Sequence, residues 1–159
     1  MIKPGARRAY LQTPLGLLEV IDEDGAIIEV RFIEPSPSVR SDSSPCLADC
    51  VSQLDEYFGG RRRRFNLNLK PRGTAFEKSV WDELLKIPFG ETSTYGRIAE
   101  SIGRSRAVRA VGGANGKNPI AVIIPCHRVI GGDGSLTEYG GGLWRKEWLL
   151  SHEHAACRG

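Results

Sequence analysis

A proline–arginine–glycine stretch at residues 71–73 divides the chain into two parts with different hydrophobic periodicities. Before it, apolar and β-branched residues form short runs separated by turn signals, and after it apolar residues recur at helical spacing. The total length of 159 residues fits one domain or two small ones. We therefore predict an α+β fold, with a small α/β N-terminal domain over residues 1–72 and a helical C-terminal domain over residues 73–159.

The N-terminal part begins with a predicted β-hairpin. Residues 15–21 and 26–33 are apolar and β-rich, and the segment between them ends in the Asp-Gly pair typical of tight hairpin turns. After a loop rich in Pro and Ser, Ser43 or Ser44 is predicted to cap a helix over residues 46–58. The alternating sequence FNLNLK at residues 65–70 predicts a further strand.

The C-terminal part contains helices with clear start and stop signals. Thr74 and Glu77 have the spacing of a capping box, and an apolar stripe follows them along one helix. Thr92 or Ser93 is predicted to cap a second helix that ends at Gly103. A short turn then leads into the sequence RAVRAVGGANG, so that the pair has the spacing of a helix-turn-helix.

The second helix of this pair is unusual for a reader of DNA sequence. Its side chains are mostly small, including Ala107, Ala110 and Gly112, and Arg109 is the one long side chain in its middle. It lacks an array of Asn, Gln or Lys that would contact base edges in the major groove. Small residues allow close approach to a DNA backbone or shallow groove, and a lone arginine can insert, which favours recognition by shape.

The charge of the chain is unevenly distributed. Its net charge is +3, but residues 1–60 carry five Lys/Arg and ten Asp/Glu, whereas residues 61–159 carry seventeen and nine. The basic part suggests a polyanionic partner such as nucleic acid, although a solvated surface explains the charge equally well. The four arginines at 61–64 fit either phosphate contact or a solvated edge. The first 25 residues lack a secretory signal and no run is long enough to span a membrane, so we expect a cytoplasmic protein.

The most reactive stretch is NPIAVIIPCHRVIGGDG at residues 118–134. We interpret its apolar part as an extended, buried segment that delivers Cys126 to the floor of a pocket, with Asn118 bonded across the turn at its entrance. An imidazole within hydrogen-bond reach generates a thiolate near neutral pH, so His127 is a candidate base for Cys126. Adjacent residues on a strand point to opposite sides, so the two can cooperate only through a turn or a bridging water, and a distant carboxylate should orient the histidine.

Other cysteine chemistries fit less well. A zinc deaminase needs Pro-Cys-x-x-Cys and an upstream His-x-Glu, but position 129 is Val and no histidine precedes His127. Cys46 and Cys50 share a helical face but lack nearby partner ligands, and the cluster at residues 152–157 is expected to be a frayed tail without a fourth ligand. We therefore expect no metal site and no cofactor.

Four segments resemble the O6-alkylguanine-DNA alkyltransferases (methylated-DNA–protein-cysteine methyltransferases) of the bacterial type. They are VWDELLKIPFGETSTYGRIAESIG, AVRAVGGANGKNP, IPCHRVIG and YGGGLWRKEWLLSHE, and the likeness covers roughly residues 74–153. The N-terminal part agrees in size and order with the family's RNase-H-like domain. The resemblance implies direct-reversal DNA repair, in which one alkyl group passes irreversibly from O6-alkylguanine in double-stranded DNA to Cys126.

The resemblance also implies roles for individual residues. Cys126 is the implied alkyl acceptor, His127 its base acting through a water, and Glu153 the group that orients His127. Asn118 is the implied hinge between the helix and the cysteine loop, and Tyr95 is expected to promote base flipping and to donate a proton toward the leaving guanine. The implied substrate-binding residues are Tyr139, Val129, Gly140 and Arg128; the implied DNA-binding residues are Arg109 as the finger that fills the gap, Tyr95, Ala107, Ala110 and Gly112.

Some features depart from the family pattern or leave alternatives open. Glu138 stands where the bacterial form usually has Gly, and the tail after Glu153 has no clear counterpart. Relatives that only bind the lesion carry Trp at the cysteine position, which disfavours that branch here. We expect a monomer that interacts with no membrane; cooperative binding on DNA and repair of O4-alkylthymine stay open. The alternative class is a helix-turn-helix regulator with an incidental or redox-sensing Cys126.

Overall fold

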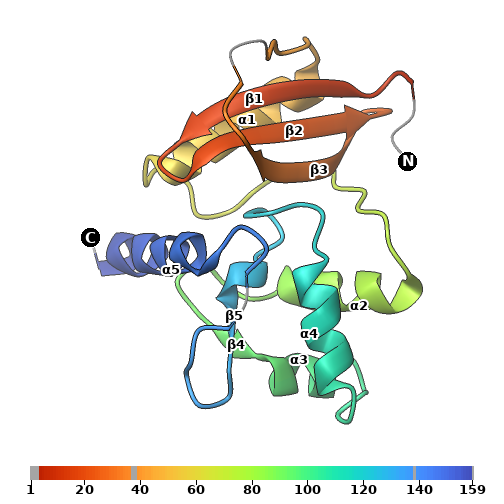
Figure 1. Ribbon diagram of the computed structural model, residues 1–159, viewed down its shortest axis with the longest axis vertical. Helices are drawn as coiled ribbons and strands as arrows, with labels where there is room; N and C mark the ends of the chain where they lie inside the picture. Colours follow the sequence, from red (N-terminus) through yellow and green to blue (C-terminus); the bar gives the residue numbers. More distant parts are fainter. Residues whose placement is uncertain (1–3, 37–38, 138, 159) are drawn as a thin grey trace. The chain divides into compact units, whose positions relative to one another are not determined.

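The computed structural model describes residues 4–36, 39–137 and 139–158 (Figure 1). Its contacts divide the chain into two compact units, Met1–Arg72 and Gly73–Gly159. Within the described ranges no helix combines the length and the hydropathy that crossing a membrane requires. Glu138 lies outside the described residues.

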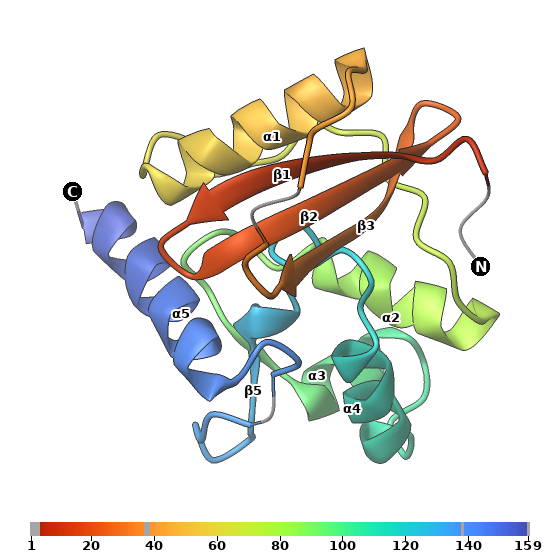
Figure 2. The same ribbon diagram turned by 45° about the horizontal axis from the view of Figure 1, so that its top comes forward.

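The first unit is an antiparallel three-stranded sheet with one helix on its face. The strands β1 (Arg7–Thr13), β2 (Gly16–Glu23) and β3 (Ala26–Ile33) lie in the order β1-β2-β3, and α1 (Pro45–Phe58) packs along the sheet (Figures 1 and 2). The predicted hairpin is confirmed as β2–β3, whose turn residues Asp24 and Gly25 both have positive φ, 52° and 78°. Such a turn matches the twist of the strands that it joins.

The helix α1 begins as the sequence predicts. The Ser44 hydroxyl accepts a hydrogen bond from the Leu47 N–H at 3.0 Å and donates one to buried Asp22 at 2.7 Å. One hydroxyl therefore caps the helix and ties it to β2. Cys50 is fully buried on this helix, and burial raises the pKa of its thiol to about 12. It therefore packs as a small apolar side chain.

The predicted strand at residues 65–70 is wrong. Only Leu69 pairs with the sheet, as a parallel bridge to Ile27. The backbone groups of Asn66 instead bond the side-chain amide of Gln53 on α1, at 2.8 and 3.1 Å. The alternating pattern misled here because the Gln53 side chain on α1 occupies backbone groups that a strand would use for pairing.

Part of the arginine run has partners within the first unit. Arg61 lies 3.8 Å from Asp55, and Arg62 lies 3.3 Å from Glu56, both on α1. These contacts favour the interpretation of the arginine run at 61–64 as a solvated edge of this unit rather than as a phosphate-binding site.

The second unit contains the helices α2 (Ala75–Leu84), α3 (Tyr95–Ser101), α4 (Val108–Gly116) and α5 (Leu143–Arg158). The capping box of Thr74 and Glu77 is confirmed in both directions, at 2.9 and 3.1 Å. Fully buried Trp81 joins α2 to α4 by donating its indole N–H to the Ala114 carbonyl at 2.9 Å.

Two predictions about helix ends need correction. The cap of α3 is Thr94, which accepts from the Arg97 N–H at 3.2 Å, rather than Thr92 or Ser93. The chain is still extended at Ser93, because β4 (Ser93–Thr94) pairs in parallel with β5 (Val129–Ile130). The tail after Glu153 is not frayed either, since α5 continues to Arg158.

Candidate active site

The residues Cys126, His127 and Arg128 form one turn of 3-10 helix, η1 (Cys126–Arg128). The segment before it is not extended, which corrects the prediction. The Ile123 N–H bonds the Ala121 carbonyl at 2.8 Å and the Cys126 N–H bonds the Ile124 carbonyl at 2.8 Å, so two tight turns precede the thiol. Val122, at the centre of the first, has a φ of 70°, which is unusual for a β-branched residue. The turn of η1 also brings three consecutive side chains out in different directions about one axis.

Two asparagines brace this turn from the end of α4. Asn118 donates through Nδ2 to the Ile124 carbonyl at 2.7 Å and accepts from the Ile120 N–H at 3.0 Å. Asn115, which is buried, donates to the Cys126 carbonyl at 3.4 Å. The predicted bond across the turn is therefore present, and Asn115 is a second brace that sequence reasoning missed.

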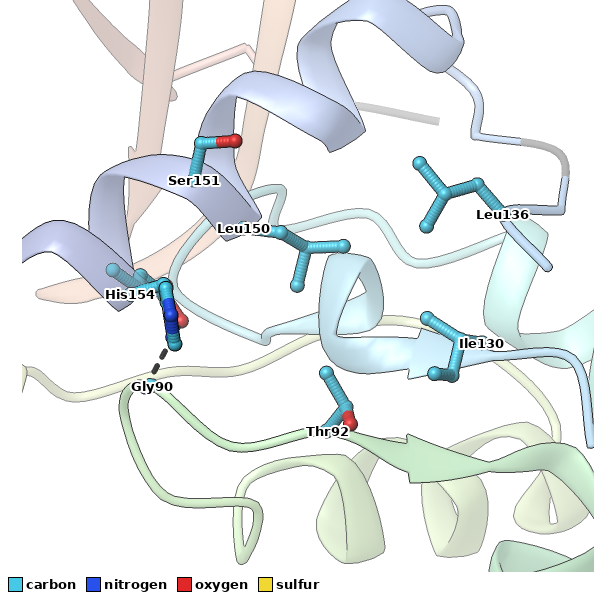
Figure 3. A pocket seen from close by; sticks show the side chains of 8 residues that line it. Gly90, Thr92, Ile130, Leu136, Leu150, Ser151 and His154 are labelled. Carbon is cyan, nitrogen blue, oxygen red and sulfur yellow. Dashed lines mark hydrogen bonds between the residues drawn. The ribbon is translucent and has the colours of Figure 1, made fainter. Parts of the chain in front are cut away.

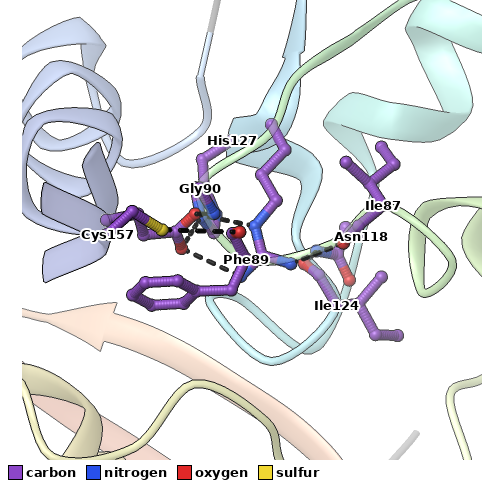
Figure 4. A network of polar contacts seen from close by, with 9 residues as sticks. Ile87, Phe89, Gly90, Asn118, Ile124, His127 and Cys157 are labelled. Carbon is purple, nitrogen blue, oxygen red and sulfur yellow. Dashed lines mark hydrogen bonds and ion pairs between the residues drawn. The ribbon is translucent and has the colours of Figure 1, made fainter.

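The His127 ring is held by Glu153 from α5, in the network of Figure 4. Its Nε2 lies 2.7 Å from Glu153 Oε2, and both side chains are buried. Because a carboxylate only accepts hydrogen bonds, Nε2 carries the proton and Nδ1 has a free lone pair. Burial lowers the pKa of His127 more strongly than Glu153 raises it, so the ring is neutral at physiological pH.

Arg128 completes the network on the carboxylate side. Its guanidinium donates to both oxygens of Glu153, at 2.8 and 3.0 Å, and to the Ile87 carbonyl at 2.7 Å. Burial alone would raise the pKa of Glu153, but the hydrogen bonds from His127 and Arg128 and the charge of Arg128 outweigh burial and hold this pKa well below its usual range. These contacts direct the Arg128 guanidinium at Glu153 and the backbone, and the role of Arg128 in substrate binding stays a prediction.

The Cys126 thiol is itself buried. Burial raises its pKa; the Asn118 side chain, the Lys146 charge and nearby backbone N–H groups oppose this rise without cancelling it. The resting thiol is therefore protonated and requires a base to become a nucleophile.

Three buried side-chain atoms lack a hydrogen-bond partner within the described ranges: Asn115 Oδ1, His127 Nδ1 and the Tyr139 hydroxyl. All three residues lie around Cys126: Asn115 donates to the Cys126 carbonyl, His127 follows Cys126 in the turn, and the thiolate form of Cys126 would raise the pKa of Tyr139. Buried polar atoms are rarely left unpaired, so such a cluster marks a site for a polar ligand.

Tyr95 and Thr137 close another side of this region. Their hydroxyls are hydrogen-bonded to each other, and Thr137 also accepts from Lys146. Lys146, buried in α5, donates to the Val129 carbonyl at 2.6 Å. Neither Thr137 nor Lys146 was expected at the site. Lys146 lies seven residues before Glu153, which places both on one helix face, and this spacing could have indicated the lysine.

Apart from Tyr95, which begins α3, the residues predicted to contact DNA lie on α4 and at its start. Arg109 and Ala110 are exposed, and Ala107 is half-buried. Gly112 lies against the Tyr95 ring, since a Cβ there would be 3.9 Å from it. Ala107 precedes α4 without capping its first N–H groups by a side chain.

A separate cavity of about 300 Å³ opens beside α5 (Figure 3). It is lined by Gly90, Thr92, Ile130, Leu136, Leu150, Ser151, Glu153 and His154. Cys126 and both site tyrosines are absent from this lining, so the cavity touches the network only through Glu153 and Gly90. In the part of the chain that the structure describes, no three His, Cys, Asp or Glu side chains form a metal-binding group.

The fold and the site define a two-unit protein with a helix-turn-helix and a buried cysteine followed by a histidine that is hydrogen-bonded to a glutamate. The family profile described as "6-O-methylguanine DNA methyltransferase, DNA binding domain" matches residues 75–155, and the one described as "6-O-methylguanine DNA methyltransferase, ribonuclease-like domain" matches residues 6–71. The chain therefore belongs to the 6-O-methylguanine DNA methyltransferase family. Its α+β fold class, with a ribonuclease-like first domain, is confirmed by these matches.

Similar proteins cover nearly the whole chain. A methylated-DNA–protein-cysteine methyltransferase of Mycolicibacterium paratuberculosis is 46% identical over 90% of this chain and 89% of the relative. One of Methanosarcina barkeri is 45% identical over 93% and 97%. The crystal structure of Mycobacterium tuberculosis OGT in complex with DNA has a TM-score of 0.84 and 44% identity, covering 92% of each chain.

Proposed function

We propose that this protein repairs DNA by moving the alkyl group of O6-alkylguanine onto Cys126 in a single, irreversible turnover. The observation that carries the proposal is the cluster of unpaired polar atoms around a buried thiol, with His127 Nδ1 among them. The names of the relatives and the DNA complex of a similar protein support the same substrate. A cytoplasmic location, expected from the sequence, is part of the proposal.

The proposed step is a displacement at the alkyl carbon. His127 Nδ1 takes the Cys126 proton, directly or through water, while Nε2–H stays on Glu153. The sulfur then forms a bond to the alkyl carbon as the carbon–O6 bond breaks, and the electron pair of that bond leaves with guanine. Tyr95 is the proposed donor of the proton that neutralises the leaving base. The product is a thioether without a good leaving group, so each molecule acts once.

The base must leave the duplex before the thiol can reach it. Extruding a nucleotide costs a few kcal/mol, and an inserted side chain compensates part of that cost. Exposed Arg109 is the proposed insert, carried on an α4 surface whose small residues Ala107 and Ala110 permit close approach to DNA. The uncapped N–H groups at the start of α4 favour a phosphate there.

The guanine pocket is proposed to lie between Tyr139 and the main chain of Val129 and Gly140. Buried Asn115, with its free Oδ1, adds an acceptor at this pocket. Asn118 holds the turn beneath it. Whether O4-alkylthymine also enters depends on this same set of acceptors.

The reaction is tested by weighing the intact protein after incubation with duplex DNA that carries O6-methylguanine. We expect a stoichiometric gain of one methyl group that maps to Cys126 and is absent from Cys126→Ser. A protein that binds this DNA without any mass change contradicts the proposal, and reversible oxidation of Cys126 coupled to sequence-selective binding supports the regulator alternative.

The role of Arg109 is tested by Arg109→Ala with two substrates. We expect alkyl transfer from duplex DNA to slow by about 10-fold or more, because a hydrogen-bonded or inserted arginine contributes about 1–3 kcal/mol at a DNA interface. Reaction with free O6-benzylguanine, which needs no base flipping, should stay within about twofold of wild type, by the same reasoning. Equal losses with both substrates refute the inserted-arginine role.

A further inference from the structure

Asn115 is an asparagine in the last turn of α4 whose surface is only 4% exposed. Its Nδ2 donates to the Cys126 carbonyl at 3.4 Å, whereas its Oδ1 has no hydrogen-bond partner among the described residues. A buried acceptor that lacks a donor costs free energy, and asparagine is also a weak helix former. Packing alone does not explain this residue, because a leucine in its place carries neither cost.

A second asparagine, three residues later, shows what a purely structural role requires. Asn118 donates through Nδ2 to the Ile124 carbonyl at 2.7 Å (Figure 4), and its Oδ1 accepts from the Ile120 N–H at 3.0 Å. Backbone groups of the cysteine segment therefore occupy both ends of that amide. Asn115 gives only its donor end to the same segment, so its acceptor end is left for a group that the described part of the chain does not supply.

The free acceptor lies where the guanine pocket is proposed. Asn115 bonds the main chain of the residue that carries the reactive sulfur. The next residue, Gly116, approaches the loop before α5, since a Cβ built on Gly140 would lie 4.0 Å from the Gly116 carbonyl oxygen. Gly140 adjoins Tyr139, whose hydroxyl is likewise buried without a partner in the described ranges. The end of α4 is therefore close both to the cysteine turn and to the loop that bears Tyr139.

The chemistry of an alkylated guanine indicates which group fits this acceptor. Alkylation at O6 removes the proton from N1, so N1 becomes an acceptor, and in DNA N9 is bonded to the sugar. The exocyclic 2-amino group then carries the only N–H donors of the base. An amide oxygen accepts hydrogen bonds and donates none, so the 2-amino group is the polar group of this base that it can bind. A flipped base is read through such bonds to its Watson–Crick edge.

We propose that Asn115 Oδ1 accepts a hydrogen bond from the 2-amino group of the flipped base and makes the protein selective for alkylated purines that carry this amine. This inference rests on the proposed function. Because Nδ2 of the same planar amide is held by the Cys126 carbonyl, one rigid group positions the base relative to the cysteine turn. A base without the amine leaves the buried acceptor unpaired, and sites of this kind discriminate strongly against such analogues.

The test compares the rates of reaction with O6-benzylguanine and with O6-benzylhypoxanthine, which is the same molecule without the 2-amino group. Both are free bases, so base flipping does not enter the comparison. Wild-type protein should react about tenfold faster with the amine-bearing base, and Asn115→Leu, which lacks the acceptor, should reduce this preference to about threefold or less. Exposed Asn68→Leu in the first unit is the matched control and should keep the wild-type preference.

Asn115→Asp separates the acceptor from the bond to the cysteine turn. Aspartate keeps an oxygen in the acceptor position but loses the Nδ2 donor, so the rates with both bases should fall while their ratio stays close to that of wild type. A merely structural role for Asn115 slows both bases alike. A ratio that is the same in wild type and Asn115→Leu therefore overturns the proposal, and so does a ratio that falls equally in Asn115→Asp and Asn115→Leu.

Two further outcomes are assigned in advance. If Asn115→Leu does not fold, the smaller Asn115→Ala takes its place with the same expected ratio, and a wild-type ratio in Asn115→Ala overturns the proposal. Wild-type protein that methylates normally from DNA but reacts equally with the two free bases sinks this inference alone, whereas wild-type protein that accepts no alkyl group from any of these substrates sinks the proposed function.

Discussion

Replacing Glu153 by glutamine changes one oxygen of the buried network into an amide nitrogen. The carboxylate accepts from His127 and Arg128 through Oε2, and from Arg128 and the Gly90 N–H, the latter at 3.3 Å, through Oε1. A glutamine whose oxygen occupies the Oε1 position keeps the second set of bonds. Its NH₂ group then faces two donors, and only His127 can adapt, by moving its proton from Nε2 to Nδ1.

That tautomer removes the proposed base. With a proton on Nδ1, the ring can no longer accept the proton of Cys126 from that side. Loss of a positioned general base lowers a rate by about 10²–10⁴-fold. We therefore expect Glu153→Gln to slow alkyl transfer by at least about 100-fold, with free O6-benzylguanine and with duplex DNA alike.

The same change affects stability in a pH-dependent way. Removing one partner of a buried ion pair costs about 3–5 kcal/mol, here because the Arg128 guanidinium stays buried beside an amide. The folded-state pKa of Glu153 lies below its ordinary value of 4.5, so its stabilisation is complete above that pH and is lost as the pH falls further. Glu153→Gln should therefore be less stable than wild type at pH 7, and the difference should shrink as the solution is acidified.

Urea unfolding at pH 7 and pH 4, together with the rate of alkyl transfer, checks these expectations. Exposed Glu147→Gln on the same helix is the matched control and should change neither quantity. A Glu153→Gln protein that reacts within about threefold of wild type refutes the tautomer argument, since loss of a working base costs far more. A stability difference that does not shrink on acidification would falsify the assigned role of the ionised carboxylate.

Two further predictions concern the backbone around the site. Gly90 has a φ of 82°, and a Cβ there would lie 2.4 Å from Cys157 Sγ. Gly90→Ala should therefore lower the free energy of unfolding, measured by chemical denaturation, by about 2 kcal/mol. Adding Cys157→Ala should recover only the part of this loss that is due to the clash, and full recovery would show that the positive φ costs nothing. Fully buried Val122 has a φ of 70°, a conformation that favours glycine. Val122→Gly should therefore be at least as stable to unfolding as Val122→Ala, although glycine ordinarily lowers the free energy of unfolding by about 1 kcal/mol relative to alanine. A glycine variant that is less stable than the alanine variant by that amount contradicts strain at Val122.

Elements with local chemical signals could be predicted from the sequence. The Asp-Gly turn, the Ser44 cap and the Thr74–Glu77 capping box each depend on residues within four positions of one another, and each is present in the structure. The likeness of residues 74–153 to one family also identified the class to which the chain belongs.

The errors came from contacts that are distant in sequence. Thr94 rather than Thr92 caps α3 because β5, more than thirty residues later, keeps Ser93 extended. The segment before Cys126 forms tight turns because Asn118 occupies the carbonyl of Ile124, which a strand would have offered to a neighbour. Lys146 escaped notice because a charged residue on a helix is ordinarily a surface residue, and only the packed structure shows that it is buried.

The short pairing of β4 with β5 has a consequence for how lesions are reached. Ser93 pairs with Val129 and Thr94 with Ile130, so this parallel two-residue pairing joins the start of α3 to the turn that bears Cys126. Under the proposed function α3 and α4 contact the duplex, and this pairing then fixes the distance from the start of α3 to the Cys126 turn before any DNA binds.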